Sequence, residues 1–71
     1  MINSNKLKQR AKSLGIRQID IADALGLKQS TVNQKINNVR PMSLDEAEII
    51  AALLKISNED FAHYFFAAEV A

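Results

Sequence analysis

The chain has 71 residues, the size of one small domain, and a net charge of +1 at neutral pH. It contains no cysteine, which excludes a disulfide framework and a zinc site built on thiolates. No segment approaches the roughly 20 apolar residues of a membrane-spanning helix, and the first residues lack the apolar core of a secretory signal, so we expect a cytoplasmic protein.

The small net charge conceals an asymmetry along the chain. Residues 1–40 carry eight basic residues against two acidic ones, whereas residues 41–71 carry one basic residue against six acidic ones. This polarity suggests that the basic half meets something anionic, although two solvated faces of opposite sign would give the same counts.

The spacing of the apolar residues is helical throughout, which predicts an all-α fold of five helices in one domain, 1–71. The first helix is expected over about Asn5–Leu14, with an inner face made of Leu7, Ala11 and Leu14. The second is expected over about Gln18–Leu25, with Ile21, Ala22 and Leu25 facing inward. Gly15 and Gly26 follow these two helices, at the position where a left-handed residue ends a helix.

The third helix is expected over about Gln29–Asn37, and its apolar stripe is narrow, with Val32 and Ile36 only. The fourth begins after Ser43, which forms a capping box with Glu46. Its inner face is expected to consist of Ala47, Ile50, Ala51 and Leu54.

The fifth helix is expected over about 58–70, after the cap residue Ser57. One apolar stripe holds Phe61, Tyr64, Phe65 and Ala68, and a second holds Ala62, Phe66 and Val70. A helix that is apolar on two sides needs a second surface to cover it. We interpret this helix as a dimerisation element with Phe61, Phe66 and Val70 at the interface; the alternative is a terminal helix wrapped within its own core.

The connection between the second and third helices is too short for antiparallel packing and forces a steep crossing. Gly26 supplies the positive φ, Leu27 fills the corner, and the small Ala22 lets the helices approach near Val32. The chain thus meets these requirements of a helix-turn-helix together, and we expect the motif at about residues 18–37.

The remaining faces of the third helix explain its narrow apolar stripe. They carry amides and hydroxyls that donate and accept hydrogen bonds, as the edges of bases in the DNA major groove require. They carry no acid, which suits a surface that meets phosphates. A solvated helix would more often carry Glu and Lys pairs.

The segment RQIDIADALGLKQSTVNQKINNVRP, Arg17–Pro41, resembles the helix-turn-helix of the lambda repressor-like, Cro/XRE family of phage and bacterial regulators. The resemblance covers roughly residues 5–56, and the chain looks like a stand-alone Cro-type repressor. It implies a homodimer, formed in solution or only on DNA, that binds a palindromic operator of double-stranded DNA in a bacterial or phage-infected cell. The third helix would enter the major groove.

The resemblance also implies roles for single residues. Gln18 would contact a phosphate and brace the recognition helix, and Asn37 would contact the DNA backbone. The positions that would contact bases are Gln29, Ser30, Asn33 and Gln34, joined by Thr31. Further phosphate contacts are expected from basic residues around the third helix, namely Arg17, Lys28, Lys35 and Arg40.

Three positions depart from the family pattern. Lys28 replaces a usual Ser or Thr, which weakens the cap of the third helix and adds a charge for phosphate. Lys35 stands where many members have an apolar residue. Asn38 stands where glycine is common, and Asn tolerates the same left-handed conformation at modest cost.

Catalysis is not expected. His63 is the only histidine, Asp20 and Asp23 are expected to be solvated, and the hydroxyls have no base partner. We therefore expect no enzyme activity, cofactor, metal or small-molecule ligand, and no membrane contact. The alternative function is a protein-interaction module on the same scaffold, such as an antitoxin or anti-repressor; RNA binding is less favoured because the basic half lacks stacking aromatics.

Overall fold

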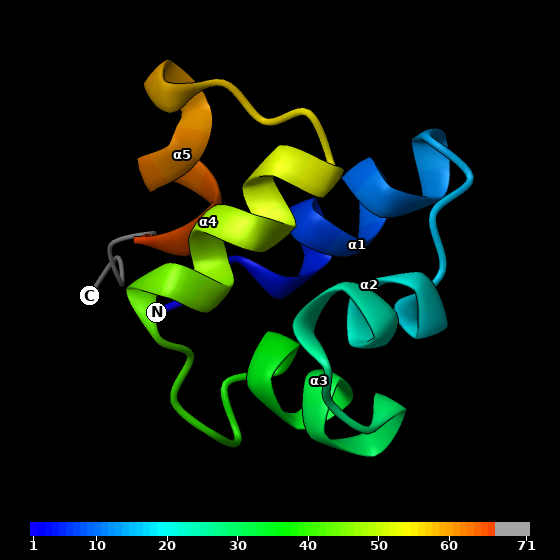
Figure 1. Ribbon diagram of the computed structural model, residues 1–71. Helices are drawn as coiled ribbons and strands as arrows, with labels where there is room; N and C mark the ends of the chain where they lie inside the picture. The colour runs from blue at the N-terminus through cyan, green and yellow to red at the C-terminus, as the bar shows by residue number, and fades with distance from the viewer. Residues whose placement is uncertain (67–71) are drawn as a thin grey trace.

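Five α-helices form in residues 1–66, which are the residues that the computed structural model describes (Figure 1). In chain order they are α1 (Ser4–Ser13), α2 (Gln18–Leu25), α3 (Gln29–Ile36), α4 (Leu44–Leu53) and α5 (Asn58–Phe65). No strand forms within this part of the chain, so the all-α prediction is confirmed. None of these helices is long and apolar enough to cross a membrane.

Local hydrogen bonds fix where the helices begin. At α4, Ser43 Oγ accepts from the N–H of Glu46 at 3.1 Å, and the Glu46 carboxylate accepts from the N–H of Ser43 at 2.9 Å, which confirms the capping box. Ser57 caps α5 through its hydroxyl. At α1, Asn3 Oδ1 accepts from the N–H of Lys6 at 3.2 Å, so this helix begins one residue earlier than predicted.

The core lies where the five helices meet, and every helix contributes to it. Burying these apolar side chains contributes about 25 cal/mol for each Å² removed from water. They are Ile2, Leu7, Ala11, Ile21, Ala22, Val32, Ile36, Ala47, Ile50, Ala51, Leu54 and Phe65. The predicted inner face of α4 is confirmed in full. Leu14, which was predicted to face inward, is 38% exposed because it lies at the end of α1, where the chain turns away.

The N-terminal segment is tied to the residue that follows α3. The N–H of Ile2 donates to Asn38 Oδ1, and Asn38 Nδ2 donates to the carbonyl of Ile2, both at 2.9 Å. The φ of Asn38 is +63°, which confirms the expected left-handed conformation. This pair of bonds holds the end of α3 against the core.

Helix α5 ends at Phe65, before the predicted end at about residue 70. Phe66 has φ −126° and ψ 39°, outside the helical region, so the predicted single helix does not continue through it. Residues 67–71, which include Ala68 and Val70 of the two predicted stripes, lie outside the described residues.

Candidate nucleic-acid interface

The turn between α2 and α3 has the geometry that the sequence predicted. Gly26 ends α2 with φ +66°, and Leu27 is half-buried against the core. Ala22 and Val32 are 3% and 1% exposed, so the two helices pack closely around them. The position of α3 is therefore set by the core and by a short turn.

The outer face of α3 is polar. Val32 and Ile36 are buried and anchor the helix, whereas four of the five predicted base-contact side chains are exposed to solvent: Gln29, Ser30, Asn33 and Gln34. Thr31, the fifth, is half-buried. No acidic residue lies on α3, so its outer face presents hydrogen-bonding groups without negative charge.

The first residues of α2 lie beside this face. Gln18 is half-buried, and its Nε2 donates to Asn33 Oδ1 at 3.4 Å, so it contacts α3; its role in bracing that helix stays a prediction. Arg17 precedes the helix, and its backbone N–H donates to the Asp20 carboxylate at 2.8 Å. Through that bond Asp20 caps the start of α2 and is not merely solvated as expected, and the same bond lowers the pKa of Asp20.

Asn37, at the end of α3, is part of the same network. Its Nδ2 donates to the carbonyl of Asn33 at 2.9 Å and to Asn33 Oδ1 at 2.7 Å. Its Oδ1 accepts from Lys8 Nζ at 2.7 Å. Side chains from α1, α2 and α3 are thus linked along one edge of the polar face.

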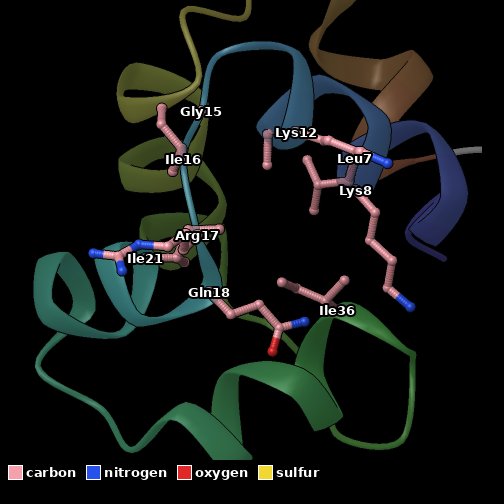
Figure 2. Close-up of a pocket in the computed structure, with 10 residues that line it drawn as sticks. Leu7, Lys8, Lys12, Gly15, Ile16, Arg17, Gln18, Ile21 and Ile36 are labelled. Atoms are coloured by element: carbon pink, nitrogen blue, oxygen red, sulfur yellow. The ribbon is translucent and has the colours of Figure 1, made fainter.

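Behind this network lies a cleft of about 340 Å³ between α1 and the start of α2 (Figure 2). Its floor is apolar and includes Leu7, Ile21 and Ile36. Lys8 and Gln18 stand on opposite sides of it, and both side chains point toward the α3 end, while the Arg17 guanidinium points away.

Lys35 takes a different role from the predicted phosphate contact. Its Nζ donates to both oxygens of the Glu46 carboxylate, at 2.7 and 2.8 Å. The two side chains are only 16% and 20% exposed. Because the ammonium is half-buried and already paired, Lys35 joins α3 to α4, and the predicted phosphate contact is not retained.

Two further predicted phosphate residues flank α3 and are exposed. Lys28 lies immediately before the helix, and Arg40 lies in the loop after it; both are exposed. The Lys28 side chain makes no capping bond, as expected of its replacement of Ser or Thr. Two exposed cations thus flank a helix whose outer face carries amides and hydroxyls.

A family model described as Helix-turn-helix, of the Cro and C1 type, matches residues 7–61, most of the chain. The chain belongs to this family. Its helix-turn-helix is α2 and α3, as the resemblance of Arg17–Pro41 implied. No solved structure matches the chain. The family binds DNA, and this protein is a DNA-binding helix-turn-helix regulator of that general class.

Within residues 1–66, no group of three or more His, Asp or Glu side chains is placed to hold a metal ion. His63 is exposed on α5.

Sequence reasoning missed three side-chain contacts around α3. The contact of Lys8 with Asn37 joins residues 29 positions apart, and no local sequence pattern predicts it. Glu46 was assigned only to a cap, and its bond with Lys35 again depends on the tertiary fold. The bond between Asn33 and Asn37 could have been found, because residues four apart face each other on a helix.

Proposed function

We propose that this protein is a Cro-type transcriptional repressor that binds a palindromic operator as a homodimer, with α3 in the major groove. The observation that carries the proposal is the exposed, acid-free amide face of α3, held by the buried Val32 and Ile36. Such a face matches the mixed donors and acceptors of base edges. Its position on a short turn keeps it rigid when it meets DNA.

Two groups of contacts follow from the positions of the side chains. Bases are contacted from α3 by Gln29, Ser30, Asn33 and Gln34, with Thr31 at the margin. Phosphates are contacted around α3 by Arg17, Gln18, Lys28 and Arg40. Asn37 was predicted among them, but both hydrogens of its Nδ2 are donated to Asn33, so its side chain has no donor left for a phosphate. The basic residues supply most of the affinity through counterion release, so the logarithm of the affinity falls with log salt by about 0.9 for each phosphate contacted.

The dimer is proposed to form through an apolar patch made of Met1, Val39, Leu44 and Phe66. These side chains are 62%, 70%, 56% and 60% exposed and border two adjoining hollows, both of which Met42 and Phe65 line. The N-terminus, the first turn of α4 and the end of α5 meet there (Figure 1).

Of the predicted interface residues, Phe66 lies in this patch. Phe61 is half-buried, with its ring centroid 4.7 Å from that of Phe65, so it supports the core rather than anchoring a partner. Val70 is outside the described residues.

The base contacts are tested by Gln29→Ala and Gln34→Ala. We expect each substitution to cost about 1–3 kcal/mol on an operator selected from random DNA, and little on random DNA itself, because random-sequence binding depends on phosphates. Fluorescence anisotropy titrations on both DNAs at one salt concentration provide the measurement.

The matched control is Gln9→Ala, which removes an exposed glutamine from α1. It should leave both affinities unchanged. If the α3 variants lost equal affinity on selected and random DNA, Gln29 and Gln34 would not contact bases.

A further inference from the structure

Four side chains form a hydrogen-bond network at the edge of α3, namely Lys8, Asn37, Asn33 and Gln18. Because the network begins with a lysine, it is fixed which atoms donate and which accept. A lysine ammonium only donates, so the atom of Asn37 that lies 2.7 Å from Lys8 Nζ must be the carbonyl oxygen Oδ1. The Nδ2 of Asn37 then faces Asn33, where it lies 2.9 Å from the backbone carbonyl, a group that only accepts. Two independent contacts therefore fix the orientation of the Asn37 amide.

The orientation of Asn33 follows from that of Asn37. The side-chain atom of Asn33 that lies 2.7 Å from Asn37 Nδ2 must be an acceptor, so it is Oδ1. The same oxygen accepts from Gln18 Nε2 at 3.4 Å, which occupies its second lone pair. The Asn33 Nδ2 group makes no hydrogen bond to any residue in 1–66, and the side chain is exposed on the outer face of α3.

We propose that Asn33 presents only hydrogen-bond donors to DNA and therefore selects a guanine or thymine edge, and that Lys8, acting through Asn37, sets this orientation. The inference rests on the proposed function and specifies one of its base contacts. In the major groove, guanine offers N7 and O6 as acceptors, and thymine offers O4. The usual bidentate pair of an asparagine with adenine needs a carbonyl oxygen facing N6, and here that oxygen is already bonded twice.

Lys8 is a positioning residue in this scheme, because it acts on Asn33 through Asn37. It keeps two further N–H donors, so it can contact a phosphate without releasing Asn37. The order of the network is Lys8 to Asn37 to Asn33, with Gln18 donating from the other side. DNA binding at this edge thus preserves the orientation rather than competing with it.

Reversing the network should reverse the base preference. In Asn37→Asp, the carboxylate accepts from Lys8 and has no donor, so the Asn33 amide must turn its Nδ2 inward and its Oδ1 toward the DNA. The Gln18 amide, which donates to Asn33 Oδ1 in the unaltered protein, must turn with it so that Gln18 Oε1 accepts. Asn33→Asp exposes an acceptor directly, at a position that is exposed and so tolerant of change. Both variants should prefer adenine or cytosine, whose N6 and N4 groups donate.

The experiment selects binding sites from random DNA with the full chain and each variant, after circular dichroism has shown equal helix content. The base contacted by Asn33 is the operator position whose preference disappears in Asn33→Ala. There the unaltered protein should enrich guanine or thymine at least about fivefold over adenine and cytosine, the lower end of discrimination by one base contact. The two aspartate variants should show the opposite enrichment.

Lys12→Gln is the control, because it changes the charge by the same amount as Asn37→Asp but takes part in none of these bonds. It should keep the guanine or thymine preference. Adenine or cytosine selected by the unaltered protein, or an unchanged preference in Asn33→Asp or in folded Asn37→Asp, would overturn the inference alone. No enriched sequence with the unaltered protein would instead overturn the proposed function, and the inference with it.

Discussion

The Glu46 carboxylate accepts three hydrogen bonds at the junction of α3 and α4. Two come from Lys35 Nζ, at 2.7 and 2.8 Å, and one comes from the N–H of Ser43 at 2.9 Å. The bond from Lys35, followed by that from Ser43, lowers the pKa of Glu46 below its ordinary value of 4.5. One residue therefore caps α4 and holds the recognition helix in place.

This contact predicts a pH dependence of stability. Because the folded pKa is the lower one, the contribution of Glu46 is fully present above about pH 4.5 and is lost as the pH falls through the folded pKa. Glu46→Gln should lower the free energy of unfolding near neutral pH by about 1 kcal/mol. Below the folded pKa of Glu46, the difference from the unaltered protein should shrink. Urea unfolding at a series of pH values measures both quantities.

Asp45→Asn is the control for this prediction, because Asp45 is an exposed neighbour without a hydrogen bond to Lys35. Its difference from the unaltered protein should be smaller near neutral pH. A constant difference between Glu46→Gln and the unaltered protein across the pH range would show that the ionised carboxylate does not stabilise the fold.

The turn between α2 and α3 requires a glycine because of its backbone conformation, and not because a side chain would lack space. Gly26 has φ +66°, and a Cβ added there would meet no atom within 4 Å. Gly15, at the end of α1, has φ +70° and is equally open. The two glycines therefore impose the same kind of strain when replaced, but only Gly26 connects α2 to the recognition helix.

Gly26→Ala and Gly15→Ala should each lower the free energy of unfolding by roughly 1–2 kcal/mol, the cost of a left-handed L-residue. Any relaxation of the turn at Gly26 moves α3, so Gly26→Ala should also weaken operator binding, whereas Gly15→Ala should not. Urea unfolding and anisotropy titrations, both done where the variants are fully folded, make the comparison. Equal operator affinities for the two variants would show that the turn does not set the position of α3.

The elements were predictable because their signals are local. Helix starts follow from caps such as Ser43 and Ser57, and helix ends follow from Gly15 and Gly26. The exposed amide face was predictable because the helical period leaves it opposite Val32.

Contacts between elements that are distant along the chain could not be predicted from the sequence. A lysine on the third helix is a typical phosphate ligand, so the sequence predicted that role for Lys35. Only the fold brings the Lys35 ammonium to Glu46. Lys8 meets Asn37 for the same reason, since α1 passes beside the end of α3.

Residues 1–66 present two surfaces of different chemistry. The amide face of α3 lies between exposed cations, whereas the patch of Met1, Val39, Leu44 and Phe66 is apolar and exposed. Exposed apolar patches on small proteins mark interaction sites, because burying them releases water. A palindromic operator requires two copies of α3 related by a two-fold axis, and such an axis pairs one patch with itself.

Phe66→Asp tests the proposed dimer. It places a charge in the patch, so self-association measured by sedimentation equilibrium should weaken at least tenfold, and binding to a full palindrome should fall toward the affinity for a half-site, because the second copy no longer adds to the first. Ile49→Asp is the matched control, since Ile49 is 43% exposed on α4 and lines neither hollow of the patch. It should retain both properties. If Phe66→Asp kept the full palindrome affinity while Ile49→Asp lost it, the two copies would meet through the Ile49 side of α4 instead.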